Sequence, residues 1–112
     1  MKSVFLMIPI FELYHIESMD QLVWNETVSE KLKDSRDKND RTEIYNALVW
    51  SETNPEYDFK SIMNDAPTPG DLKFSNTEIY NYLLEFKVFM EHPDYGLLTD
   101  DRAPKTWEDY MN

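Results

Sequence analysis

Carboxylates are the most abundant side chains in this sequence that could do chemistry. The 112-residue chain has 22 Asp and Glu residues against 11 Lys and Arg, and residues 42–112 alone hold fourteen acids against five bases. Two carboxylates held close together can exchange protons with a substrate, and acids at alternate positions beside a glycine can bind Ca²⁺. The acids in predicted turns are Asp58, Asp65, Asp71, Asp94, Asp100 and Asp101. They do not alternate in this way, so no metal site is predicted.

Other catalytic residue types are scarce. The chain has no cysteine and only two glycines, which excludes a Cys nucleophile, a Cys-ligated zinc site and a Gly-rich phosphate loop. His15 and His92 have no second ligand at metal-binding spacing. We expect a structural role for His15 and a favourable interaction of His92 with a helix C-terminus. The sequence therefore predicts a protein that is not an enzyme and has no cofactor.

The acids of residues 42–112 are accompanied by eight Tyr and Trp residues. Tyr and Trp are favoured at the energetic centres of protein interfaces, and a strongly negative surface attracts basic partners and repels nucleic acid. The alternative is that the aromatic residues are core and the acids are a solvated shell. We predict a partner-binding surface made of Glu52, Glu56, Tyr57, Asp58, Asp65, Asp94, Tyr95, Asp100, Asp101, Trp107, Glu108 and Asp109.

This surface predicts a small acidic protein that inhibits a basic protein partner by stoichiometric association. Carboxylates spaced along helices can imitate the phosphates of a duplex. The expected partner is therefore a nuclease, another nucleic-acid-binding protein or a host-defence protein, and direct binding of nucleic acid is not expected. The alternative is a homo-oligomeric assembly module, a homodimer joined through an N-terminal strand or through the face of a helix at residues 77–91.

The segment FKVFMEHPDYGLLTDDRAPKTW, residues 86–107, has an E-H-P turn followed by acids, a Pro and a Trp. It resembles the region from helix II to helix IV of the colicin DNase immunity proteins, and this resemblance implies a toxin-immunity role. The style of the chain, which is small, acidic, Cys-free and rich in Asn, Lys and Tyr, is similar to that of early phage proteins that inhibit host enzymes. That similarity implies a DNA mimic used in host takeover.

A repeated pentapeptide, TEIYN, organises the expected helices and occurs at residues 42–46 and 77–81. The two copies follow capping-box patterns at Asp40 and Ser75, each with a Glu three residues later. Each predicted helix stops just before a proline, and these prolines are Pro55 and Pro93. The pattern predicts a duplicated helix-turn unit, about residues 42–76 and 77–112. The second helix is expected to bury Ile79, Leu83, Phe86 and Met90.

Residues 2–16, KSVFLMIPIFELYHI, form a nearly unbroken apolar run. The run is a poor signal peptide, because only Lys2 supplies positive charge and no cleavage site follows, and it is too short to span a membrane. We expect a cytoplasmic protein without a membrane partner. The β-branched and aromatic residues favour a strand, Pro9 places it at an edge or a break, and residues 21–24 could complete a hairpin.

Three more helices are expected, at Asn25–Asp40 with Asn25 as the cap, at residues 55–63 and at residues 104–111. The predicted fold is a single α+β domain over residues 1–112, in which an N-terminal strand or β-hairpin packs on four to five helices.

Overall fold

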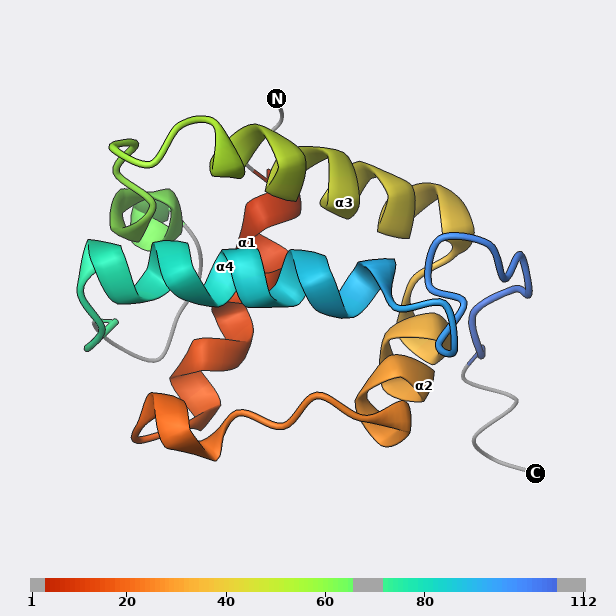
Figure 1. Cartoon of the computed structure of the whole chain (residues 1–112). Coiled ribbons are helices and arrows are strands. Elements are labelled where there is room, and N and C mark those ends of the chain that lie inside the picture. The colour runs from red at the N-terminus through yellow and green to blue at the C-terminus, as the bar shows by residue number, and fades with distance from the viewer. Residues whose placement is uncertain (1–3, 66–71, 107–112) are drawn as a thin grey trace.

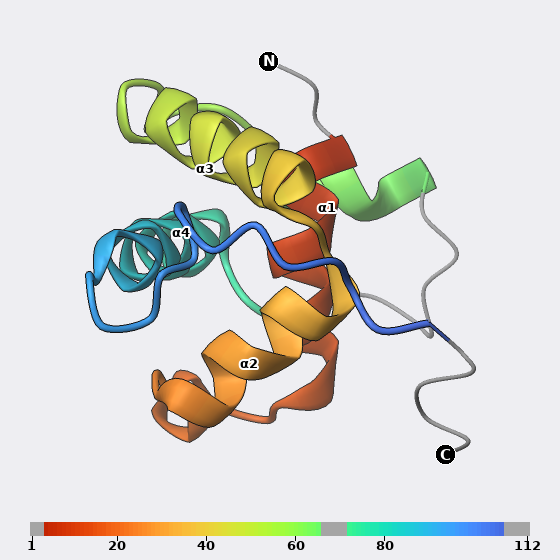
Figure 2. The same cartoon turned by 90° about the vertical axis from the view of Figure 1, so that its right-hand side faces the viewer.

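The computed structural model describes residues 4–65 and 72–106, which form four α-helices and three short 3-10 helices. In chain order these are α1 (Val4–Phe11), η1 (Glu12–His15), η2 (Met19–Gln21), α2 (Glu26–Ser35), α3 (Lys38–Glu52), η3 (Lys60–Asp65) and α4 (Asn76–Glu91). No β-strand occurs within these two ranges, so the predicted α+β class is wrong and the described fold is helical. Helices α3 and α4 lie side by side in opposite directions, and α1 crosses behind both (Figure 1 and Figure 2).

The N-terminal apolar run forms α1 where a strand was predicted. Leu6, Ile10 and Leu13 are fully buried, and their spacing of four and three residues defines one face of a helix. Pro9 lies inside α1 and has no amide hydrogen to donate, but its carbonyl accepts a 2.6 Å hydrogen bond from the Tyr82 hydroxyl. The strand prediction failed because an unbroken apolar run fits the period of a strand and that of a helix equally well.

The predicted return strand at residues 21–24 is also absent. Gln21 ends η2, which Ser18 caps, and the following segment is held by aromatic packing. The Trp24 ring lies 5.9 Å from the Tyr82 ring, 5.5 Å from Phe86 and 5.1 Å from Phe89, between ring centroids. Packing of Trp24 against α4 therefore holds this segment in place without the backbone hydrogen bonds of a β-sheet.

The predicted caps of the two repeat helices have different outcomes. The capping box of α4 is confirmed: Ser75 Oγ accepts from the Glu78 amide at 3.1 Å, and Glu78 Oε1 accepts from the Ser75 amide at 3.0 Å. The α3 cap prediction at Asp40 is wrong, because Asp37 accepts from the Asp40 amide and starts the helix three residues earlier. The helix predicted for Asn25–Asp40 is therefore divided: α2 ends at Ser35 and α3 begins at Lys38.

The TEIYN repeat reflects a pseudo-symmetric pairing of α3 and α4. Ile44 and Ile79, at the same place in the repeat, are both fully buried. The following tyrosines reach across the pair in opposite directions, since Tyr45 donates to the last residue of α4 (Glu91, 2.6 Å) and Tyr80 donates to the carbonyl of the last residue of α3 (Glu52, 3.2 Å). The same residues of the repeat therefore make equivalent contacts from α3 to α4 and from α4 to α3.

Beyond these helices, the turn units of the predicted duplication do not match each other. The chain after α3 forms η3, which replaces the helix predicted at residues 55–63, whereas the chain after α4 forms non-helical turns as far as residue 106. Residues 104–106 are not helical, and the rest of the helix predicted at 104–111 lies outside the described residues.

One apolar core joins α1, α3, η3 and α4. Its buried members are Leu6, Ile10, Leu13, Ile44, Ala47, Leu48, Phe59, Ile62, Met63, Leu72, Phe74, Ile79, Tyr82, Leu83, Phe86, Phe89, Met90 and Leu97. The four residues predicted to form the buried face of the second repeat helix are all in this set, so that prediction is confirmed. Leu97 carries the core into the chain that follows α4.

A buried cation connects this core to the C-terminal part of the described chain. The Arg41 side chain is fully buried and donates to the carbonyls of Arg36 (3.1 Å), Leu97 (2.5 Å) and Asp100 (2.6 Å). Burial lowers the pKa of this guanidinium from its ordinary value. A buried charge is tolerated only where hydrogen bonds replace its lost hydration, and these carbonyls supply that replacement.

Replacing Arg41 by Leu tests this role. The substitution leaves three carbonyls without their donor, so it should lower the free energy of unfolding by about 3–5 kcal/mol. The control is Lys38→Leu, one turn earlier in α3, where the side chain is exposed and has no ion pair with another described residue; it should change stability by less than about 0.5 kcal/mol. Urea denaturation followed by circular dichroism measures both, and equal midpoints for the two variants would refute the role of Arg41.

Candidate partner-binding surface

The structure does not bring the twelve predicted surface residues together. Glu52, Glu56, Tyr57 and Asp58 lie where α3 ends, and Asp94, Tyr95, Asp100 and Asp101 lie at the opposite end of the molecule, after α4 (Figure 1). The 16-residue α4 separates the two groups, which corresponds to about 24 Å at 1.5 Å per residue. The Asp65 side chain, Trp107, Glu108 and Asp109 lie outside the described part of the chain.

The first group forms an exposed aromatic site bordered by acids, which we call the Tyr57 corner (Trp50, Glu52, Glu56, Tyr57 and Asp58). The Tyr57 ring is 40% exposed and packs edge-on against Trp50, with centroids 4.9 Å apart. Its other neighbour is the buried Phe59, at 5.3 Å. An aromatic side chain that is anchored on two rings yet open to solvent has the form of an interface anchor.

The backbone of the Tyr57 corner is fixed to the start of α4. The Asn76 side-chain amide donates to the Tyr57 carbonyl at 2.9 Å, and its oxygen accepts from the Lys60 amide at 3.1 Å. Asp58 accepts from the Ser61 amide at 3.2 Å, which caps the start of η3. These bonds hold the ring in place before any partner arrives, which reduces the entropy lost on binding.

The carboxylates of the Tyr57 corner remain available to a partner. Glu56 and Asp58 are exposed and form no ion pair with another described residue. Glu52 is the exception, because it lies 3.6 Å from Lys87 Nζ. Lys87 itself bonds more closely to Glu91, at 2.8 Å, and that hydrogen bond raises the pKa of Lys87.

The second predicted group has mostly structural roles. Lys33 is buried; its ammonium donates to the Tyr95 carbonyl at 2.7 Å and lies 3.6 Å from Asp100. The Tyr95 ring packs on Phe89 and His92, with centroids 5.1 and 4.7 Å away. The backbone amide of Arg102 donates to Asp100 and lowers the pKa of that carboxyl.

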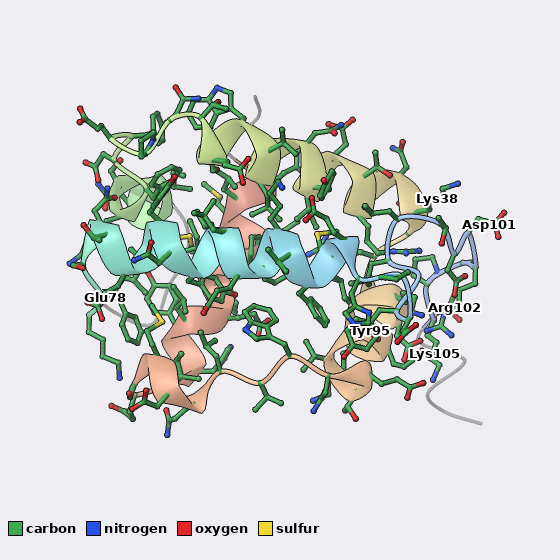
Figure 3. The ribbon with its side chains drawn as sticks, in the orientation of Figure 1. Lys38, Glu78, Tyr95, Asp101, Arg102 and Lys105 are labelled. Atoms are coloured by element: carbon green, nitrogen blue, oxygen red, sulfur yellow. The ribbon has the colours of Figure 1, made fainter. Side chains whose placement is uncertain are left out.

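The chain beyond α4 is attached to α2 by an ion-pair network. Arg102 bonds to Glu30 and lies 3.3 Å from Asp34. The Lys105 ammonium is 3.4 Å from Asp34, and the Lys105 amide donates to the Asp34 carbonyl at 2.8 Å. Figure 3 shows Tyr95, Arg102 and Lys105 gathered at this end, with Asp101 pointing outward. Asp94 and Asp101 are the exposed carboxylates that the predicted group retains here.

A further feature that the sequence did not indicate is an apolar groove of about 780 Å³ between α1 and α2. Its walls come from α1, η1, residues 21–24 and α2, and Met63, Tyr82 and Phe86 of η3 and α4 also line it. The strand prediction for residues 2–16 concealed it, because one wall of the groove is the outward face of α1. Lys31 of α2 and Arg36, which directly follows α2, also line it.

Two other kinds of site can be compared with the described residues. Within residues 4–65 and 72–106, no three His, Asp or Glu side chains are placed to hold a metal ion. The same residues include no helix of the length and apolar character that crossing a bilayer requires.

Comparison with known proteins returns no relative: no family model, no curated protein and no solved structure matches this chain. The likeness of residues 86–107 to immunity proteins therefore stays a prediction.

Acid titration tests the ion-pair network. The hydrogen bond from Arg102 lowers the pKa of Glu30 below its ordinary value of 4.5, so on acidification the unfolded chain binds protons at this position before the folded chain does. The network's contribution to stability should be complete above pH 4.5 and should be lost as the pH falls through the lowered folded-state pKa.

The variant Glu30→Gln removes this titration, so its urea midpoint should fall less than that of the wild type between pH 6 and pH 3. The matched control is Glu85→Gln, which removes an exposed carboxylate of α4 that has no ion pair with another described residue. Its midpoint should fall in parallel with the wild type. If Glu30→Gln and the wild type show equal slopes, the network does not link α2 to the chain beyond α4.

Proposed function

We propose that this protein is a non-catalytic inhibitor that binds a basic protein partner in a one-to-one complex through the Tyr57 corner. The observation that carries this proposal is the exposed Tyr57 ring, which is fixed on Trp50 and Phe59 and bordered by the carboxylates of Glu52, Glu56 and Asp58. An anchored aromatic surrounded by charge supplies a centre of binding energy and a polar rim, as protein interfaces do.

The charge of the whole chain supports the same proposal. A formal net charge of −11 attracts a basic partner over long range and raises its association rate. A partner that normally binds nucleic acid has a basic surface shaped for phosphates, and carboxylates on a fixed backbone can occupy it. The proposed partner is therefore a nuclease, another nucleic-acid-binding protein or a toxin, and the proposed location is the cytoplasm.

We choose between the two acidic ends by asking which carboxylates already form ion pairs within the chain. At the end beyond α4, the carboxylates of Glu30, Asp34 and Asp100 are engaged by cations of this same chain. At the Tyr57 corner, Glu56 and Asp58 have no such partner among the described residues. A basic partner gains more from carboxylates that do not have to leave an existing ion pair.

The alternative function is a homo-oligomeric assembly module. It was expected to associate through an N-terminal strand or through the face of a helix at residues 77–91, and neither surface is available among the described residues. The described residues contain no strand edge, and the apolar face of α4 is in the core. No other observation favours this alternative, and the Tyr57 corner carries the proposal.

The test begins by isolating the partner with immobilised protein from a lysate at low salt, followed by elution at high salt and mass spectrometry. Calorimetry with the purified partner should then give a stoichiometry of one. Tyr57→Ala should weaken binding by about 30-fold, the effect of losing about 2 kcal/mol at an interface centre. Glu56→Gln with Asp58→Asn should chiefly slow association.

The matched control carries Asp94→Asn with Asp101→Asn. This variant removes the same number of exposed charges from the opposite end, so its affinity should stay within about twofold of the wild type. Circular dichroism confirms that every variant is folded. Equal losses in the control and in the Glu56/Asp58 variant, or affinity that does not change with salt, would refute the proposed site.

A further inference from the structure

Exposed apolar side chains gather at the groove between α1 and α2. Among the described residues, six large apolar side chains are exposed, and three of them border this groove: Val4 at 52%, Phe11 at 38% and Val23 at 57%. Half-buried Met7 and Leu32 line it between them. Exposed apolar residues gathered around a hollow mark a binding surface, whereas scattered ones do not.

The borders of the groove carry opposite charges. Lys31 projects from α2 and Arg36 directly follows that helix, and neither forms an ion pair with another described residue. Glu12 stands on the opposite wall, just after α1, and is also without an ion pair there. By contrast, Arg102 and Lys105, in the chain beyond α4, are paired with Glu30 and Asp34. Two unpaired cations beside an apolar hollow, in a chain with net charge −11, offer a local site for acidic groups.

We propose that this groove binds the apolar face of an amphipathic helix from a partner protein, with acidic side chains on the flank that faces α2. Helix-in-groove binding buries an apolar stripe between two walls. The wall formed by α1 and η1 is about 20 Å long, at about 1.5 Å per residue in the α-helix and about 2.0 Å in the 3-10 helix, which matches nearly four turns of a docked helix.

The exposed border selects a helix over a small amphiphile. A ligand confined to the hollow would leave much of the exposed Val4 and Val23 side chains in water, whereas a helix laid along the hollow can cover both. Lys31 in α2 and Arg36, which directly follows α2, both line this side of the groove, so acids along one flank of the partner helix can meet them. Glu12 lies on the opposite wall of the groove and repels acidic side chains there. It therefore favours the orientation in which the acidic flank of the partner helix faces α2.

The proposal does not rest on the Tyr57 corner. None of the five residues of the Tyr57 corner lines the groove. Their partners also have opposite charge requirements, so either proposal can fail while the other stands.

The probes are two fluorescein-labelled synthetic helical peptides of 18 residues. They share leucines at a 3-4 spacing, and one carries Glu along one flank where the other carries Lys. Fluorescence anisotropy with the full chain should show micromolar binding of the Glu peptide and at least about tenfold weaker binding of the Lys peptide. Val23→Asp should abolish binding of the Glu peptide. Since Val23 is already exposed, this change should leave the fold intact.

Charge reversal is the decisive variant. Lys31→Glu with Arg36→Glu should weaken the Glu peptide by at least about tenfold and strengthen the Lys peptide. The control, Lys38→Glu with Lys60→Glu, makes the same change in net charge at exposed cations outside the groove, and it should shift affinity by less than about threefold.

Three outcomes would overturn the proposal. The first is no binding of the Glu peptide at physiological salt. The second is equal loss of affinity in the groove and control variants, which would show that only net charge matters. The third is stoichiometric binding of palmitate that depends on Lys31 and Arg36 while neither peptide binds, which would assign the groove to a small amphiphile.

Discussion

The burial of Arg41 is the constraint on which the arrangement of the chain depends. A guanidinium removed from water needs acceptors on every side, and here they are backbone carbonyls from the link between α2 and α3 and from the turns after α4. Meeting that need brings segments 56 and 59 residues apart in sequence into contact. The buried Lys33 ammonium likewise joins distant segments, because it donates to the Tyr95 carbonyl, 62 residues further along the chain.

This arrangement gives the two ends of the antiparallel α3/α4 pair different roles. At one end, Lys33, Arg102 and Lys105 pair with the carboxylates of Glu30, Asp34 and Asp100, so these acids hold the chain beyond α4 against α2. At the other end, Glu56 and Asp58 beside Tyr57 are exposed and form no ion pair with another described residue. The cross-helix bonds of Tyr45 and Tyr80 keep the two helices aligned, and with them the separation of the ends.

The sequence predicted features that depend on neighbours along the chain. Ser75 with Glu78 and Asn25 are correct caps, since capping is decided within one turn. The choice of Asp40 over Asp37 was wrong because both have the short oxygen-bearing side chain that a cap needs. The strand predicted for residues 2–16 failed for a different reason: the buried spacing of Leu6, Ile10 and Leu13 is visible only once their neighbours in the core are known.

The candidate sites were less predictable than the helices. Asp100 and Asp101 are adjacent and chemically equal in the sequence, yet one faces Lys33 and the other faces solvent. That difference comes from partners more than 60 residues away, which no local pattern encodes. The groove between α1 and α2 was hidden because its wall had been assigned to a strand.

Amide hydrogen exchange measured by NMR on the full chain tests the central role of Arg41 most directly. The Asp100 amide is bonded to the Gly96 carbonyl, within the turn whose Leu97 and Asp100 carbonyls accept from Arg41. It should exchange at least about 100-fold more slowly than in an unstructured peptide, because opening this turn requires breaking the Arg41 hydrogen bonds. Exchange of this amide at the unstructured rate, with α3 and α4 still protected, would show that Arg41 does not hold this part of the chain in place.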